Sequence, residues 1–258
     1  MAATSLFAQS VLSLRGVAAA LLSLLLGACA QTGERPRGST DSFANTVANF
    51  DPKQIGKADI DRVADLHRRE IFASVRVLAE KLYRRNPREW KKGGHASVEA
   101  ALDSLLDPRT GWRPVDAAGK RGTDAILLAL SPEFAGDRVA AFVGGLGGML
   151  NAAFDEKTEF FLTDELDPQK IHNSARNLEI AAWKLANARD AGGTLLLASN
   201  EAAQAGQPAN LSFEREFGKM IGNLDLLSAL LADKGHRTIA RVAQSLATAV
   251  FLPVPSLR

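Results

Sequence analysis

His67 and Glu70 form the pair of residues whose types and spacing come closest to a metal site. Side chains three positions apart on a helix share one face, so this pair could offer a nitrogen and an oxygen atom to one metal ion. A zinc or di-iron site needs three or more protein ligands, and the sequence has no second pair with suitable spacing. The other histidines, His95, His172 and His236, occur singly. We therefore predict no metal and expect His67 to be hydrogen-bonded and partly buried.

The residues that serve nucleophilic or acid–base catalysis do not form a recognisable set. The chain has no G-x-S-x-G motif and no S-x-x-K sequence followed by its partner motifs, and its single cysteine is Cys29. Carboxylate pairs such as Glu156 with Glu159, or Asp164 with Glu165, are numerous, but nothing singles out one pair for acid–base work. The sequence therefore favours a non-enzymatic protein without a cofactor, and a hydrolase with unidentified carboxylates is the alternative.

Gly144, Gly145, Gly147 and Gly148 lie within one predicted helix, where each glycine costs about 1 kcal/mol relative to alanine. Because Gly144 and Gly148 stand four positions apart, one face is bare and another backbone could approach it closely. Three interpretations stay open: close helix packing, shallow or re-entrant membrane contact, and a helix break that lines a ligand site. The surrounding apolar run is too short to span a bilayer. No strand precedes the glycines and no Lys-Ser/Thr pair follows, which excludes phosphate-loop and dinucleotide motifs.

Basic and acidic residues are segregated along the chain. Residues 81–92 carry six bases and one acid, and residues 155–167 carry six acids and one lysine. A basic surface with aromatic side chains could contact anionic lipid headgroups or polyanionic sugars, and the acidic segment could then bind a partner. Alternatively, the two segments face each other or are solvated surfaces. The residues of the candidate basic-aromatic surface are Arg84, Arg85, Trp90, Lys91, Lys92 and Trp112.

A polar ridge is expected on the helix predicted over residues 168–189. Its members recur at helical spacing and could line a groove, although hydrogen bonds along the flank of a helix would explain them equally well. They are His172, Asn173, Arg176, Asn177, Glu179 and Trp183.

The overall composition limits the kind of protein this can be. The 31 bases and 29 acids give a net charge of +2, so the chain lacks the basic excess of nucleic-acid-binding proteins and we predict no nucleic-acid partner. A hydrophobic content of 46% is enough to build a core and argues against global disorder. Since no cysteine follows Cys29, the fold cannot depend on intrachain disulfides.

Apolar residues at the 3.6-residue period of an α-helix position the side chains described so far. This periodicity predicts helices over residues 58–85, 98–106, 123–130, 132–154, 168–189, 213–234 and 237–251. Ser97 and Ser212 are expected to cap helices, Pro168 to occupy a first helical position, and Gly235 to end a helix. Residues 107–122 read as a loop. No alternating strand pattern or repeat is present, so the predicted fold is all-α, with six to eight helices in one domain.

The amino-terminal 28 residues differ from the rest of the chain. They contain one charged side chain, Arg15, followed by an 11-residue apolar block that ends in Gly27 and Ala28. A positive residue, a short apolar region and a small-residue cleavage site are typical of a secretory signal peptide. The block is too short to cross a bilayer, which takes about 20 apolar residues.

Leu26-Gly27-Ala28-Cys29 resembles the lipobox of bacterial lipoproteins. The resemblance implies cleavage between Ala28 and Cys29, a diacylglycerol on the Cys29 thiol and an acylated new amino terminus, so the bilayer is an expected partner. More than one acyl chain is needed for stable membrane attachment. Ala30 stands where retention in the inner membrane is associated with an aspartate, so the resemblance also implies sorting to the outer membrane, facing the periplasm.

These observations predict a bacterial lipoprotein precursor with four segments. They are a signal peptide (1–28), a flexible tether (29–58), a helical periplasmic domain (59–252) and a C-terminal tail (253–258). We expect the domain to act as a non-enzymatic envelope scaffold or accessory subunit that binds an envelope protein near the membrane. Two alternatives stay open: a cell-wall glycan hydrolase, and a carrier of an apolar ligand in a cavity beside Gly144 to Gly148.

Overall fold

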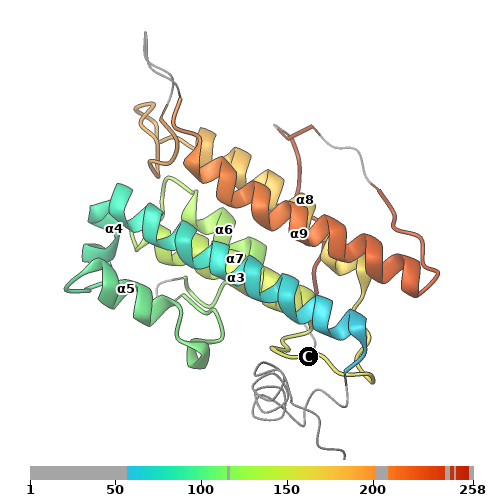
Figure 1. The fold of residues 1–258 in the computed structure, drawn as a ribbon. Coiled ribbons are helices and arrows are strands. Elements are labelled where there is room, and N and C mark those ends of the chain that lie inside the picture. Colours follow the sequence, from blue (N-terminus) through green and yellow to red (C-terminus); the bar gives the residue numbers. More distant parts are fainter. Residues whose placement is uncertain (1–56, 115–116, 202–208, 242–244, 247, 256–258) are drawn as a thin grey trace, which may run out of the picture. The chain divides into compact units, whose positions relative to one another are not determined.

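The computed structural model describes residues 57–114, 117–201, 209–241, 245–246 and 248–255. Within these residues the chain forms seven α-helices, a 3₁₀ turn and no β-strand, which confirms the all-α fold class (Figure 1). The predicted signal peptide, Cys29 and the tether up to residue 56 lie outside the described residues. The elements are α3 (Asp59–Arg85), α4 (Pro87–Lys92), α5 (Val98–Leu105), η2 (Pro108–Thr110), α6 (Gly122–Ala129), α7 (Arg138–Ala153), α8 (Pro168–Asn187) and α9 (Ser212–Lys234).

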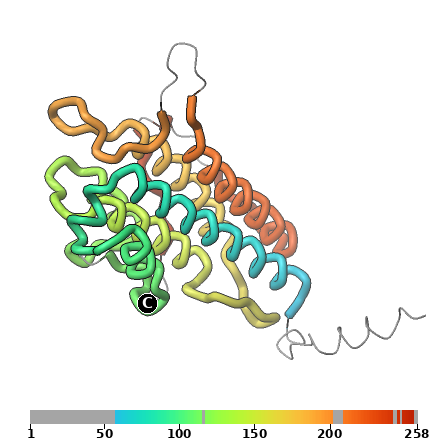
Figure 2. The backbone as a smooth tube through the Cα atoms, turned by 60° about the vertical axis from the view of Figure 1, so that its left-hand side comes forward, coloured from blue at the N-terminus to red at the C-terminus, as the bar shows by residue number. Residues whose placement is uncertain are grey.

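Four helices, α3, α7, α8 and α9, enclose the main hydrophobic core. Helix α3 packs on α9 and α7, and α8 packs on the same two helices from the other side. Figure 1 shows α3 and α9 in front, with α7 behind α3 and α8 behind α9, and Figure 2 shows the same neighbours from another direction. Helices α3 and α9 are antiparallel, because the Lys81 ammonium donates to the Ser212 carbonyl (2.6 Å) while His67 meets Asn223 nearer the opposite ends.

The sequence of α3 explains both its length and its buried face. The Asp61 carboxylate accepts a hydrogen bond from the Ala58 N–H (2.7 Å) and so satisfies a free donor at the helix start. At the other end, the Asn86 side chain donates to the carbonyl of Leu82 (2.9 Å). Between these ends, apolar residues at three- and four-residue intervals are removed from water. They include Ile71, Val75, Leu78 and Leu82, all fully buried.

Helix α7 begins later than its apolar pattern predicts. We expected a helix from Pro132, but the first helical residue is Arg138, and the Asp137 carboxylate caps the helix by accepting from the Ala140 N–H (2.9 Å). Before the cap, the chain is held in a loop by the Arg138 guanidinium, which donates to the carbonyls of Ser131 (2.7 Å) and Pro132 (3.2 Å). Thirteen of the sixteen residues of α7 are buried, so it is the central helix of the fold.

The ends of α8 and α9 follow the predicted signals in all but one place. Pro168 is the first residue of α8, and Gly235 is the residue that ends α9. Ser212 does not cap α9, because it is already helical and Leu211 stands in the capping position without a side-chain bond. The first free N–H groups of α9 are instead bound by Asn210, which accepts from Ser212 (3.1 Å), and by Asn200, which accepts from Phe213 (3.1 Å).

The shorter helices pack against α3 and α7. Ser97 caps α5 as expected, since its hydroxyl oxygen accepts from the Ala100 N–H (3.2 Å). Helix α6 packs along α7, and α4 contacts both α3 and α7. In the predicted loop 107–122, the described residues contain only the 3₁₀ turn η2 before α6 begins at Gly122.

The helix predicted over residues 237–251 is wrong. The described part of this range contains no helix. Amide side chains of α8 bind the backbone here instead: Gln169 exchanges two hydrogen bonds with Ala240 within this range (2.8 and 3.1 Å), and Asn177 exchanges two with Leu252 directly after it (2.6 and 2.8 Å). Tertiary bonds therefore outweigh a local helical pattern, which is only a weak preference.

Candidate functional site

The glycines of α7 lie where other parts of the chain approach its backbone closely. A Cβ atom on Gly145 would stand 2.7 Å from the carbonyl oxygen of Gly122 and 2.8 Å from the backbone nitrogen of Ile126, both in α6. Real Cβ atoms do not come this close to backbone atoms, so only glycine fits at position 145.

None of the helices in the described residues combines the length and the apolar character that a membrane span requires.

Two side chains of the 107–122 loop fill the remaining glycine recesses of α7. A Cβ on Gly144 would lie 2.7 Å from Cγ of Pro114, and one on Gly147 would lie 1.9 Å from Cε3 of Trp112. The Trp112 ring also packs on Phe72, with ring centroids 5.3 Å apart. The glycine face is therefore occupied from within the protein by α6, Trp112 and Pro114.

Trp112 adopts a backbone conformation that bulky residues avoid. Its φ angle is 59°, in the left-handed region, next to Gly111 at 58°. A bulky residue there is an outlier whose strain must be balanced by surrounding contacts. The ring contacts with Gly147 and Phe72 provide those contacts, so the loop is fixed at this point.

The candidate basic-aromatic surface is largely neutralised by acids of the same chain. Three of its four bases form ion pairs, and Lys91 lies over the ring of Trp90 at 5.3 Å from the centroid. Trp90 and Trp112 both pack against the core. The ion pairs are Arg84–Glu80 (2.8 Å), Arg85–Glu201 (2.5 Å) and Lys92–Glu89 (2.8 Å).

The acidic segment finds its ion-pair partners outside the basic segment. Glu165 pairs with Arg237 (3.2 Å), which follows α9, and Asp155 pairs with Lys170 of α8 (2.8 Å). Asp167 caps α8 by accepting from the N–H of Gln169 (2.9 Å). These bonds attach the 155–167 segment to α8 and to the residues that follow α9.

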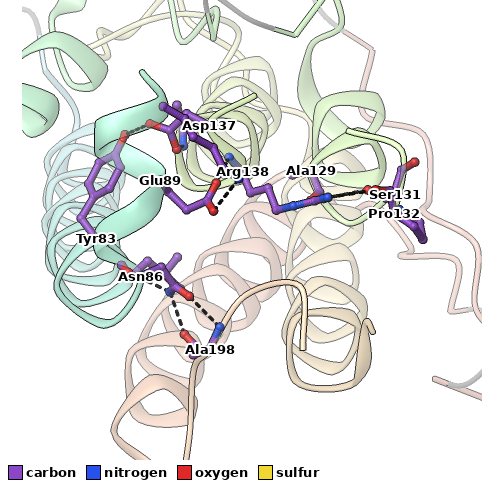
Figure 3. Close-up of polar contacts among 12 residues, drawn as sticks. Tyr83, Asn86, Glu89, Ala129, Ser131, Pro132, Asp137, Arg138 and Ala198 are labelled. Atoms are coloured by element: carbon purple, nitrogen blue, oxygen red, sulfur yellow. Dashed lines mark hydrogen bonds and ion pairs between the residues drawn. The ribbon is translucent and has the colours of Figure 1, made fainter. Parts of the chain in front are cut away.

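A buried cluster of polar side chains surrounds the start of α7 (Figure 3). The Tyr83 hydroxyl donates to Oδ2 of Asp137 (2.9 Å), whose Oδ1 accepts from Ala140. The Glu89 carboxylate accepts from the backbone N–H of Arg138 (2.8 Å). Both buried acids therefore bind free N–H groups at the first turn of α7, where negative charge is also favoured by the helix dipole.

Arg138 joins the same cluster to α6. Its guanidinium donates to the carbonyl of Ala129 (2.7 Å), the last residue of α6, as well as to Ser131 and Pro132 (Figure 3). A cation at this place also suits the carbonyl end of α6. One residue thus connects the end of α6 to the start of α7.

Burial changes the proton affinity of this cluster. It raises the pKa of Asp137 above its ordinary value, although the bonds from Ala140 and Tyr83 act in the opposite direction. Burial and the neighbouring Asp137 carboxylate also raise the pKa of Tyr83 strongly. A cavity of about 130 Å³ adjoins the cluster, with His95 and Arg113 in its lining.

The sequence did not point to Glu89 or Asp137 as special carboxylates. Asp137 had a readable signal, since an aspartate just before an apolar run is a helix-capping pattern. The expected start at Pro132 concealed that signal. No local sequence signal marks Glu89, because it binds the backbone of Arg138, 49 residues away in the chain.

His67 and the polar ridge of α8 also make contacts within the chain. Nδ1 of half-buried His67 lies 2.7 Å from Oδ1 of Asn223. Arg176 binds both oxygens of Asp225 on α9 (2.7 and 2.8 Å), and Asn173 donates to the Pro253 carbonyl (3.0 Å). Within the described residues, no group of three or more potential ligands is placed to hold a metal ion.

A hollow with a volume of about 600 Å³ lies beside the C-terminal half of α7. The 107–122 loop, the start of α6, the end of α7 and the C-terminal segment 251–254 form its walls. Gly148 is the member of the α7 glycine group that lines it, and two arginines, Arg113 and Arg121, stand at its edge. The hollow is therefore of mixed polarity.

A second pair of glycines lies on the outside of α9. A Cβ added to Gly218 or Gly222 would meet no atom within 4 Å, in contrast to the glycines of α7. Leu226 and Leu230 continue the same line at four-residue spacing, and their exposed fractions are 55% and 38%. We call these four residues the α9 outer face.

Comparison of the chain with protein-family models, with curated proteins and with solved structures found no significant match in any of the three.

Proposed function

We propose that this protein is a lipid-anchored envelope protein whose helical domain works without catalysis, as a scaffold or accessory subunit on the periplasmic side of the outer membrane. The lipobox-like Leu26 to Cys29 supports the anchor. The buried carboxylates Glu89 and Asp137 accept bonds from backbone N–H groups and so have a role as helix caps. The domain then contributes binding surface rather than chemistry.

The observation that carries this proposal is the α9 outer face. Large apolar side chains of soluble proteins are usually exposed singly, and a contiguous apolar line is typical of a binding surface. Leu226 and Leu230 follow two open glycines on one line of a 23-residue helix. Helix α3, which packs along α9, exposes Leu66 and Val77 as well.

The shape of this face favours a helix as its partner. Glycines four residues apart leave a shallow groove in which another backbone can approach closely, as in small-xxx-small helix contacts. Leu226 and Leu230 would then contact apolar side chains of the arriving helix, at i and i+4. We therefore assign the α9 outer face to an apolar helix of an envelope protein. Anchoring at Cys29 would raise the local concentration of the domain near such a partner.

Photocrosslinking in intact cells tests the proposal. A photoreactive residue at Leu226 should give one dominant adduct with a single protein, mapped by mass spectrometry to an apolar helix of that protein. Leu127 on α6 is the matched control, because it is a leucine of similar exposure (47%) on another helix. Equal adducts from both positions, adducts to lipid alone, or adducts between two copies of this chain would overturn the assignment.

The anchor is tested separately. Cys29→Ser should abolish labelling with fatty acid and release the domain from the membrane fraction, because the thiol that carries the lipid is gone. A variant that fractionates with membranes like the wild type would show that Cys29 is not the anchor.

A further inference from the structure

The 600 Å³ hollow has the size and composition of a ligand site. Pockets for small molecules usually measure about 300–1,000 Å³ and combine apolar walls with a few placed polar groups. The apolar wall here comes from two directions: Trp112 and Met149 on one side, and the C-terminal segment with Phe251 and Val254 on the other. The polar groups come from Arg113, Arg121, Thr123, Asn151 and Glu156.

Positive charge predominates at the edge of this hollow. Arg113 and Arg121 are exposed, and neither forms an ion pair with a described residue. Glu156 is the acid in the lining, so the charged side chains there sum to +1. Some other exposed arginines, such as Arg84 and Arg85, are paired. The two guanidinium groups are therefore available to a ligand.

The position of Arg113 is fixed by its two neighbours in the chain. Trp112 occupies the recess over Gly147, and Pro114 occupies the recess over Gly144. With both neighbours held on α7, the backbone of Arg113 cannot move without unpacking the glycine face. Such preorganisation lowers the entropic cost of binding.

The opposite wall is also held in place. The side chain of Asn177 donates to the Leu252 carbonyl (2.8 Å) and accepts from its N–H (2.6 Å), and Asn173 donates to the carbonyl of Pro253 (3.0 Å). The C-terminal segment thus forms a preformed apolar wall, although it has no regular secondary structure in its described residues.

From this arrangement we propose that the hollow binds a small amphipathic organic anion. Its carboxylate would be bound by Arg113 and Arg121, which can hold planar anions with paired N–H donors. Its apolar body would lie between Trp112 and Met149 on α7's side and Phe251 and Val254 on the other. The α9 outer face takes no part in this site, so the proposal is independent of the partner assignment.

Titration calorimetry with a matched set of probes tests the site. The probes are decanoate, decanol and decyltrimethylammonium, each below its micelle concentration, added to the full exported chain carrying Cys29→Ser. Decanoate should bind with one-to-one stoichiometry and change the fluorescence of Trp112, while the neutral and cationic probes should bind at least about tenfold more weakly. Equal affinity for all three probes, or no binding of decanoate, would overturn the proposal.

Variants locate the binding to this hollow. Arg113→Gln and Arg121→Gln should each weaken decanoate binding about tenfold or more, since each removes a charge-assisted hydrogen bond. Lys120→Gln is the matched control: it removes one exposed charge from the same loop but not from the lining, and should leave the affinity unchanged. Equal losses in all three variants would indicate a general charge effect. Arginine-dependent binding to vesicles with anionic lipid, without binding of free decanoate, would assign the site to a bilayer and also contradict the proposal.

Discussion

Two helices of this protein carry glycines four residues apart, and their surroundings are opposite. On α7, a Cβ at Gly144 would overlap Pro114 at 2.7 Å, and Gly148 borders the start of α6. On α9, a Cβ at Gly218 or Gly222 would meet nothing within 4 Å. The same spacing therefore serves close packing inside the protein in one helix and leaves an open line on the surface in the other.

The difference matters because glycine in a helix is costly. Each one loses about 1 kcal/mol relative to alanine, mainly through the entropy of the unfolded chain. On α7 the cost is offset by the approach of α6 and of the rings of Trp112 and Pro114. Within the described chain, nothing offsets it on α9. A partner that needs a smooth face would explain why the glycines of α9 are there.

The largest expected effect comes from filling a recess of α7. In Gly147→Leu the new side chain occupies the place of the Trp112 ring, so the ring must leave its contacts with Phe72. We expect a loss of about 3 kcal/mol in the free energy of unfolding, from overpacking. Urea denaturation followed by tryptophan fluorescence measures it. A variant with the unfolding midpoint of the wild type would show that the recess is not tightly filled.

Asp137, the buried residue that caps α7, gives a second test of this helix. Because burial raises the pKa of Asp137, the folded protein holds this proton more tightly than the unfolded chain. The contribution of this bound proton to the free energy of unfolding is fully present below the unfolded-state pKa of about 3.9. It is lost as pH rises through the folded-state pKa. Asp137→Asn stays neutral and keeps a capping oxygen. The difference in free energy of unfolding between Asp137→Asn and the wild type should therefore shift in favour of the variant as pH rises from about 4 to about 7.

Urea midpoints of both proteins at the two pH values measure this gain. Asp137→Ala serves as the control for the cap itself: it should lose about 1–2 kcal/mol at the lower pH, and this loss should shrink at the higher pH, because alanine does not titrate either. A difference between Asp137→Asn and the wild type that stays constant with pH would show that Asp137 titrates normally.

A smaller effect on stability is expected for a substitution on the α9 outer face. Leu226 is more than half exposed, so Leu226→Lys should change the free energy of unfolding by less than about 0.5 kcal/mol. The same change places a charge on the α9 outer face and should remove the protein adduct seen from a photoreactive residue at Gly222. Thermal melts and crosslinking in cells are the two measurements. Persistence of the adduct would argue that the partner does not contact this line.

A similarly small effect on stability is expected in the basic segment. Arg85 pairs with Glu201 on the surface, and exposed ion pairs contribute about 0.2–1 kcal/mol. Arg85→Gln should therefore lower stability by no more than that, and less at high salt. Denaturation at low and high ionic strength checks this, with Arg88→Gln, another exposed arginine beyond the end of α3, as the control. A loss of several kcal/mol would mean that the pair has a structural role.

The helices could be predicted where their signals are local. The period of α3, the Ser97 cap of α5 and the Pro168 start of α8 are all contained in a few neighbouring residues. The predictions were wrong where distant residues decide the outcome. Gln169 exchanges two hydrogen bonds with the backbone of Ala240, 71 positions away, in the segment where the local pattern predicts a helix.

The candidate site was predictable only in part, for the same reason. The α7 glycines stood out because they are costly in a helix, but the sequence could not tell which residues would fill their recesses. Trp112 and Pro114 come from a loop more than 25 residues earlier, and the sequence alone predicts Trp112 to lie on a basic surface. Nothing in the sequence distinguishes Gly218 and Gly222, since their exposure depends on how α9 packs against α3 and α8.

The most direct measurement of the difference between the two helices is the unfolding free energy of Gly145→Ala and Gly222→Ala, determined side by side. Both changes add one methyl group to a helix. Gly145→Ala should lose about 1–3 kcal/mol, because its Cβ meets the backbone of Gly122 and Ile126. Gly222→Ala should gain up to about 1 kcal/mol, because its Cβ meets only solvent. Shifts of the same sign would contradict the account of one filled and one open glycine face.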